Sequence, residues 1–265
     1  MRVLPPRWVV ERFGAAGEPE PLCGGQNQSV RVGVLVFKPV LDADESEWLG
    51  SVLSPIPDGP GFRLARPVRS RDGHFVVAGF QAFEWVAGTA SPGGRWLKVL
   101  ETARAFHAAI AGIPPHPLLA RRRHRWALSD RVSFGEAILV PVTERVRRLA
   151  EALVPLSGPT TDPPTLIHGD LSGNVLFADG IPPAVIDVSP YYRPAIFAEA
   201  VIVVDAWLWH GEGEGLASCL RGPDSRRYLA RALLFRLTAL NEHAREDPAV
   251  LGDLEFFERV IGWVT

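Results

Sequence analysis

The segment from Ile167 to Phe177 constrains the fold of this chain more than any other stretch. It reads Ile-His-Gly-Asp-Leu-Ser-Gly-Asn-Val-Leu-Phe, so a histidine, an acid and an amide lie between two apolar runs. A second apolar run, Ala184 to Ile186, follows a turn at Asp179-Gly180 and ends in another acid, Asp187. We predict two short strands over 175–177 and 184–186, with polar side chains in the loop before them and at their end.

Three oxygen-bearing side chains in this region predict a site for a metal-bound nucleotide. Asp170 is the candidate base, because a carboxylate in such a loop can accept a hydroxyl proton and orient the oxygen. Asn174 and Asp187 supply the hard oxygen donors that Mg²⁺ prefers. His168 is grouped with Asp170 as a catalytic candidate and is expected to brace the loop. The alternatives are a plain polar turn at 168–170 and a capping acid at Asp187.

The pattern of apolar residues changes near residue 88. Before it, strand-like segments dominate; after it, helical periodicity does. We therefore predict an α+β, bilobal fold, with a small antiparallel sheet in residues 1–87 and a larger helical part in residues 88–265. The predicted strands lie within 22–38, 62–68 and 75–86, and the predicted helices are 5–13, 43–54, 96–113, 134–153, 194–209, 225–243 and 250–264.

Lys38 stands out because the chain has only two lysines, Lys38 and Lys98, among 28 basic residues. It ends the apolar run 34–37, from which its ammonium can reach the phosphates of a nucleotide. A carboxylate should hold it, and helical spacing places Glu45, rather than Glu47, on the inward face of helix 43–54. The alternative is an ordinary edge-strand lysine.

Two backbone segments are candidates for binding the rest of the nucleotide. A glycine-containing turn can present N–H groups to phosphates, although such turns are also common in hairpins. The strand that ends near residue 86 can offer the Glu84 carbonyl and the Val86 N–H to adenine, with Trp85 as an alternative core residue. The turn consists of Gly24, Gly25, Gln26 and Asn27.

Charge and composition exclude several other classes of function. The net charge of −2 gives no basic field for nucleic acid, and no apolar run is long enough to span a membrane. Cys23 and Cys219 lack metal spacing and, with no leader-like segment in the sequence, we expect reduced thiols and a cytoplasmic protein. The basic run 121–125 is expected to be solvated or to bind phosphate or an acidic partner. The Gly-x-Ser-x-Gly motif of serine hydrolases is missing.

Taken together, these residues resemble the aminoglycoside phosphotransferase family, within the protein-kinase-like superfamily. The resemblance covers nearly the whole chain and depends most on His168-Gly-Asp170, Asn174 and Ile186-Asp187. It implies a kinase-like bilobal fold, Mg²⁺ with ATP or GTP as the phosphoryl donor, and a small-molecule hydroxyl as the acceptor.

The chain departs from the family pattern at three places. The family places its asparagine five residues after the aspartate, whereas Asn174 follows Asp170 by four. Glu199 is expected to replace a structural aspartate of the family. The segment 191–193 (Tyr-Tyr-Arg) is expected either to line the acceptor site or to pack the loop.

The leading functional hypothesis is a small-molecule kinase. The second hypothesis is a kinase-like nucleotide-binding or scaffold protein without turnover.

Overall fold

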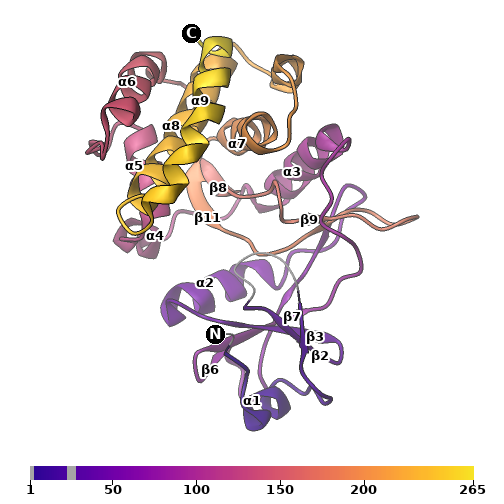
Figure 1. Cartoon of the computed structure of the whole chain (residues 1–265). Coiled ribbons are helices and arrows are strands. Elements are labelled where there is room, and N and C mark those ends of the chain that lie inside the picture. The colour runs from indigo at the N-terminus through magenta and orange to yellow at the C-terminus, as the bar shows by residue number, and fades with distance from the viewer. Residues whose placement is uncertain (1–2, 23–27) are drawn as a thin grey trace.

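An antiparallel sheet forms most of the N-terminal part of the computed structural model, which describes residues 3–22 and 28–265. Its strands run in the order β1-β2-β3-β7-β5, and β6 pairs with β7. Figure 1 shows this sheet at one end of the molecule, next to helix α1. The bounds are α1 Arg7–Arg12, β1 Glu20–Pro21, β2 Val30–Val32, β3 Leu35–Pro39, β5 Pro67–Val68, β6 Val76–Val77 and β7 Phe80–Glu84.

Alternation along β3 explains how Lys38 reaches the site. Leu35 and Phe37 are buried in a small apolar cluster with residues of α1, β2 and β7. Successive side chains of a strand point to opposite faces, so Lys38 lies on the face away from that cluster. Its register partner is Gln81 on β7.

Helix α2 (Ala43–Leu53) lies between this sheet and the helical part (Figure 1). Asp42 caps it by accepting a hydrogen bond from the Glu45 N–H at 3.0 Å. Gly50 packs directly on Phe75, since a Cβ there would lie 2.4 Å from the ring. The helix is therefore fixed against the sheet on one side and, through Leu53, joins the larger core on the other.

A second, short sheet joins the two halves of the sequence. Strand β4 (Arg63–Leu64) pairs in parallel with β10 (Ala184–Val185), which pairs antiparallel with β9 (Val175–Leu176). The last two are the strands predicted around the Asp179-Gly180 turn. Phe62 and Leu64 belong to the larger apolar core, so residues before position 87 contribute to the packing of both parts.

The connection near residue 88 is held closely against β9. Thr89 exchanges backbone hydrogen bonds with Phe177, at 2.9 and 3.0 Å. Gly88 has φ +143°, and a Cβ there would lie 2.8 Å from the Leu176 Cβ. Both the backbone angle and the close approach therefore require glycine at this crossing.

Helices make up most of the C-terminal part. Helix α7 is buried along most of its length and packs with α8, α3 and α9 around the larger core (Figure 1). Besides β9 and β10, this part contains β8 (Thr165–His168) and β11 (Pro190–Arg193), which form an antiparallel pair. The helices are α3 Trp96–Ile110, α4 Pro117–Arg121, α5 Arg125–Ser133, α6 Glu144–Leu153, α7 Ala195–Trp209, α8 Ser225–His243 and α9 Leu254–Val260, with 3-10 turns at Val154–Leu156, Glu214–Cys219, Pro248–Asp253 and Ile261–Trp263.

The predicted α+β class is confirmed, and two helix predictions are corrected. The helix expected over 134–153 begins only at Glu144, where the Thr143 side chain caps it. The C-terminal segment predicted as one helix is a short helix between 3-10 turns. Within residues 3–22 and 28–265, no helix has the length and apolarity needed to cross a bilayer.

Candidate active site

His168 is a buried brace at the end of strand β8. Its Nδ1 accepts hydrogen bonds from the backbone N–H groups of Asp170 and Ser189, both at 3.2 Å. The proton must then be on Nε2, which donates to the Ile186 carbonyl at 3.1 Å. Burial lowers the pKa of His168, so the ring is neutral. It holds the loop to the segment that carries Asp187 and has no exposure to a substrate.

A second histidine, His107 on α3, supports the first. Its Nε2 accepts a hydrogen bond from the His168 backbone N–H at 3.0 Å. Burial and the nearby His168 ring lower the pKa of His107 to about 3. His107 lies within the helix predicted over 96–113, and nothing in that helical pattern indicates contact with a residue 61 positions away.

Asp170 extends from this braced loop and is half exposed. Its Oδ1 accepts a hydrogen bond from Arg236 Nη2 at 2.9 Å. Arg236 lies on α8 and is buried, and it also binds both carboxylate oxygens of Asp205, at 2.7 and 2.5 Å. Burial acts to lower the pKa of Arg236, but the charges of Asp205 and Asp170 outweigh burial and raise it. The guanidinium is therefore a fixed positive charge beside the candidate base.

The acid that supports the loop is Asp205, which corrects the expectation for Glu199. Ser172 in the loop donates a hydrogen bond to Asp205 Oδ2 at 2.6 Å. Glu199 instead accepts from Arg104 on α3, at 3.0 and 2.6 Å. Both acids lie on α7, and only the folded chain shows which of them faces the loop.

Asn174 closes the shortened loop. Its Nδ2 donates to the Asp170 carbonyl at 2.7 Å, so the loop folds back on itself over four residues. Its backbone carbonyl accepts from the Ile186 N–H at 3.0 Å, which places Asn174 beside the strand end that carries Asp187. Among the described residues, its amide oxygen makes no hydrogen bond, so it is available to a cation.

Lys38 and Asp187 form an ion pair across the site, with Nζ and Oδ2 2.9 Å apart. Lys38 is mostly buried and Asp187 is half exposed. Asp187 has φ +52°, a left-handed conformation that acids and amides tolerate better than most side chains. The turn at Asp187 directs its carboxylate towards the sheet that carries Lys38.

Glu45 does not hold Lys38 in the structure, contrary to the predicted pairing. Both of its carboxylate oxygens accept hydrogen bonds from Arg122, at 2.7 and 2.5 Å. Arg122 also donates to the Pro190 carbonyl at 2.5 Å, so it ties α2 to the strand that follows Asp187. Glu47 accepts from the backbone N–H groups of Phe75 and Val76. The prediction used helical spacing, which shows the inward face but not the partner on it.

The remaining predicted nucleotide contacts are only partly described. Gly24, Gly25, Gln26 and Asn27 lie outside the described residues. Glu84 ends β7, and its carboxylate lies 3.5 Å from Arg66. The Val86 N–H makes no hydrogen bond to the described residues. The Arg31 guanidinium lies over the Trp85 ring, with its Cζ 4.2 Å from the ring centroid.

The segment 191–193 packs the loop. Tyr191 is buried against Gly169, where a Cβ would lie 2.5 Å from the tyrosine ring. Arg193 binds Asp130 and Glu136 through four hydrogen bonds of 2.6 to 2.9 Å. The loop that carries Asp170 is therefore packed from the side by β11.

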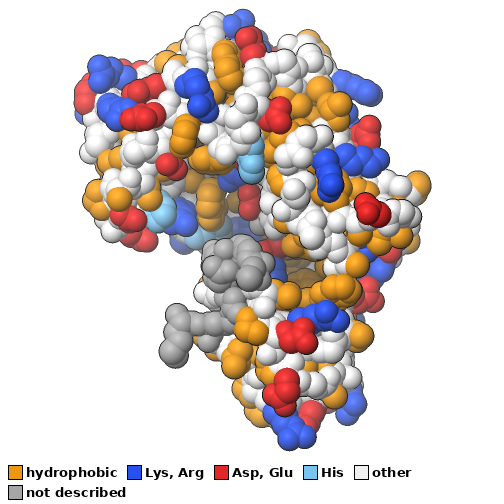
Figure 2. All heavy atoms as spheres, turned by 45° about the vertical axis from the view of Figure 1, so that its right-hand side comes forward, with side chains coloured by type: hydrophobic (Ala, Val, Ile, Leu, Met, Phe, Trp, Pro, Cys, Tyr) orange, Lys and Arg blue, Asp and Glu red, His pale blue; other side chains and the backbone are white. Residues whose placement is uncertain are grey.

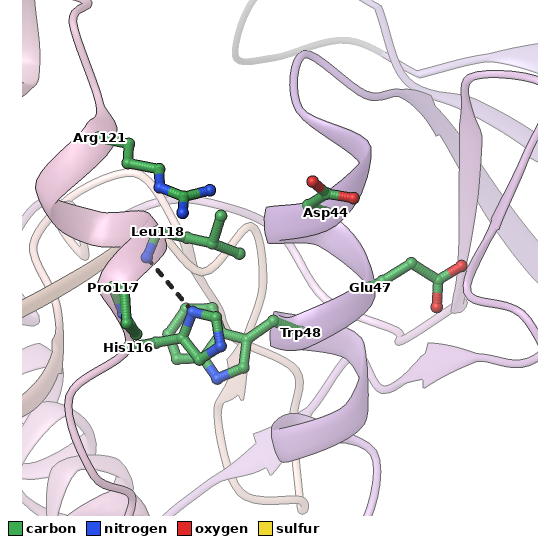
Figure 3. Close-up of a pocket in the computed structure, with 7 residues that line it drawn as sticks. All are labelled: Asp44, Glu47, Trp48, His116, Pro117, Leu118 and Arg121. Atoms are coloured by element: carbon green, nitrogen blue, oxygen red, sulfur yellow. Dashed lines mark hydrogen bonds between the residues drawn. The ribbon is translucent and has the colours of Figure 1, made fainter.

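Two hollows are each lined by residues from before and after position 88. The surface narrows between the two parts, and side chains of both charges gather there (Figure 2). One, of about 430 Å³, lies between α2 and α4. In Figure 3, Trp48 stacks on His116, and Asp44 and Arg121 face each other across the gap. The second, of about 560 Å³, is lined by Leu41, Arg123, His124, Arg125, Trp126, Leu128, Glu242, Arg245 and Glu246.

Solved structures of small-molecule phosphotransferases share this fold over nearly the full chain. An aminoglycoside phosphotransferase from Alicyclobacillus acidocaldarius superposes with TM-score 0.69 at 16% identity, over 100% of this chain and 94% of that one. An AMP-bound spectinomycin phosphotransferase gives 0.63 at 11%, over 97% and 96%. A choline kinase from Streptococcus pneumoniae gives 0.59 at 10%, over 97% and 96%.

These comparisons confirm the kinase-like fold that the sequence resemblance implied. No protein-family model matches the sequence, and no curated protein matches it. The likeness therefore lies in the fold, at sequence identities where function does not follow from similarity.

Proposed function

We propose that this chain transfers the terminal phosphoryl group of ATP or GTP, bound with Mg²⁺, to a hydroxyl group of a small molecule. The observation that carries the proposal is the convergence of Asp170, Asn174, Asp187 and Lys38 at one edge of the braced loop. One of the structural neighbours is described with AMP bound, which supports a nucleotide as the phosphoryl donor.

In this proposal Asp170 is the base. The acceptor oxygen attacks the terminal phosphorus, the bond between that phosphorus and the nucleoside diphosphate oxygen breaks, and the hydroxyl proton passes to the Asp170 carboxylate. The free Oδ2 side of this half-exposed carboxylate serves that role, while Arg236 fixes Oδ1. His168 and His107 hold the loop backbone in place.

The donor set fits Mg²⁺. Asp187 offers a carboxylate and Asn174 an amide oxygen without a protein partner, and Mg²⁺ takes few protein ligands when phosphate oxygens complete its shell. No group of three or more His, Cys, Asp or Glu side chains that could hold a metal occurs in the described part of the chain, which suits a metal shared with the nucleotide. When bound, the ion would neutralise charge that develops on the phosphates.

Lys38 keeps this region electrically balanced before the nucleotide arrives. Its ammonium neutralises Asp187 at 2.9 Å. In the proposed complex, Lys38 moves its charge to the phosphates and Asp187 turns to the metal. The free Val86 N–H and the Glu84 carbonyl remain the proposed adenine contacts, and residues 24–27 the proposed phosphate turn.

Asp170→Asn tests the reaction directly. The variant keeps the shape and the Arg236 contact but cannot accept a proton, so we expect product formation to fall by at least about a hundredfold. Nucleotide affinity with Mg²⁺, measured by titration calorimetry, should stay within about twofold. Asp179→Asn, at an exposed turn in the same sheet, is the matched control.

The alternative is a kinase-like nucleotide-binding or scaffold protein without turnover, which the four-residue spacing from Asp170 to Asn174 favours. Mg-dependent nucleotide binding without transfer to any of a broad panel of alcohols would favour it. Equal turnover of the wild type and Asp170→Asn would instead remove Asp170 from the reaction.

A further inference from the structure

Arg236 has a donor that the site described above does not use. Its Nε and Nη2 bind Asp205 and Asp170, whereas Nη1 makes no hydrogen bond to the described residues. The side chain is only 5% exposed. A guanidinium with two N–H bonds left unpaired beside the proposed base can donate to an oxygen of the acceptor.

Aromatic rings frame this guanidinium on several sides. Its Cζ lies 5.4 Å from the Trp126 ring centroid, 5.7 Å from that of Trp209 and 5.3 Å from that of Phe235. Trp209 is 43% exposed, and Trp126 lines the 560 Å³ hollow. Trp126 therefore both lines the hollow and lies next to the guanidinium that binds Asp170.

The hollow carries more unpaired positive than negative charge. Glu242 accepts from Arg245 at 3.1 Å, so these two charges offset each other. Arg123, Arg125 and Glu246 make no ion pair among the described residues, which leaves two cations and one anion. Arg125 lies over the Trp126 ring at 5.4 Å, on the wall of the hollow.

We propose that the hollow at Trp126 is the acceptor site and that the acceptor carries an anionic group, a carboxylate or a phosphate, besides its reacting hydroxyl. Arg123 and Arg125 bind the anionic group, Arg236 Nη1 donates to a neighbouring oxygen, and the hydroxyl reaches Asp170. This inference extends the proposed phosphotransfer and, for the reaction itself, depends on that proposal. The positive charge of the hollow can be tested without it.

The same geometry disfavours a cationic acceptor. An aromatic cage for an ammonium needs free ring faces, and here arginine guanidinium groups already lie over the Trp126 ring. A polycation would also meet the unpaired Arg123 and Arg125.

Fluorescence quenching tests the charge of the hollow without any turnover. Iodide and caesium ions are compared at equal ionic strength in the wild type and in Trp126→Phe, and the difference reports on Trp126. We expect iodide to quench the Trp126 signal at least about threefold more strongly than caesium. Arg123→Gln with Arg125→Gln should reduce that preference, whereas the control Arg148→Gln, at an exposed position of α6, should not. Equal or stronger quenching by caesium would overturn the proposal.

A matched acceptor series tests the substrate class. Glycerol, D-glycerate, sn-glycerol 3-phosphate and 3-amino-1,2-propanediol share a vicinal diol and differ in the charge of the group on the third carbon. We expect kcat/KM for one of the two anionic compounds to exceed that of the amine by at least about tenfold, and the better anion distinguishes a carboxylate site from a phosphate site. A preference for the amine or for glycerol overturns the inference. Iodide-selective quenching without transfer to any of the four supports the charge of the site and places the failure with the proposed reaction.

Discussion

At the scale of single residues, the site depends on a close contact between Gly169 and Tyr191. An added Cβ at position 169 would lie 2.5 Å from the tyrosine ring, and Tyr191 is too buried to move freely. We expect Gly169→Ala to lower the free energy of unfolding by about 1–3 kcal/mol, measured by urea denaturation. Gly173→Ala in the same loop meets no atom within 4 Å and should change it by less than about 0.5 kcal/mol. Equal effects of the two substitutions would contradict this packing.

The two lysines of the chain offer a matched comparison. Lys38 binds Asp187, whereas Lys98 makes an exposed pair with Glu101. Lys38→Ala should raise the nucleotide KM or lower kcat by at least about tenfold, because it removes the charge proposed to meet the phosphates. Lys98→Ala should leave both constants unchanged. Steady-state kinetics at varied nucleotide concentration measures both constants for the two variants.

Asp187 can be tested apart from turnover. Asp187→Ala removes the proposed metal ligand, so Mg-dependent nucleotide affinity should fall by about tenfold or more. Calorimetric titration of nucleotide with and without Mg²⁺ measures the effect. An unchanged affinity would exclude Asp187 from the metal site.

At the scale of elements, a largely buried ion pair reinforces the apolar contacts that hold helix α2 against the C-terminal part. The Arg122 side chain is 9% exposed and that of Glu45 20%. Arg122→Gln leaves the Glu45 carboxylate without its two hydrogen bonds and should destabilise the fold by roughly 3 kcal/mol in a urea titration. Arg123→Gln, one position further along and exposed, should cost less than about 0.5 kcal/mol. If the two variants unfold alike, the Glu45 pair does not tie α2 to this part.

At the scale of the whole molecule, the buried histidines make stability depend on pH. The pKa of His107 falls from an ordinary value of 6.5 to about 3 in the folded chain, and burial also lowers that of His168. The unfolded chain therefore binds protons first as pH falls. The contribution of His107 is complete above about pH 6.5 and is lost progressively towards pH 3, by roughly 1 kcal/mol for each pH unit, and that of His168 changes in the same direction.

Urea midpoints between pH 7 and about pH 4.5 measure this loss. His107→Gln keeps an acceptor for the His168 N–H but does not titrate, so its midpoint should fall less steeply with pH than that of the wild type. His74→Gln, at a side chain 69% exposed, should keep the wild-type slope. An unaltered slope in His107→Gln would show that this histidine does not titrate on unfolding.

The α+β class, the strand pair around the Asp179-Gly180 turn, most helices and the polar loop 168–174 could be predicted from the sequence, because periodicity and turn chemistry depend on neighbouring residues. The pairing of charges could be learned from the folded chain alone. Lys38 pairs with Asp187 and Glu45 with Arg122, Asp205 rather than Glu199 holds the loop, and Arg236 reaches Asp170. These partners are far apart in sequence, and many arginines and acids compete for each place. Helical spacing shows which face a side chain occupies, but packing selects its partner.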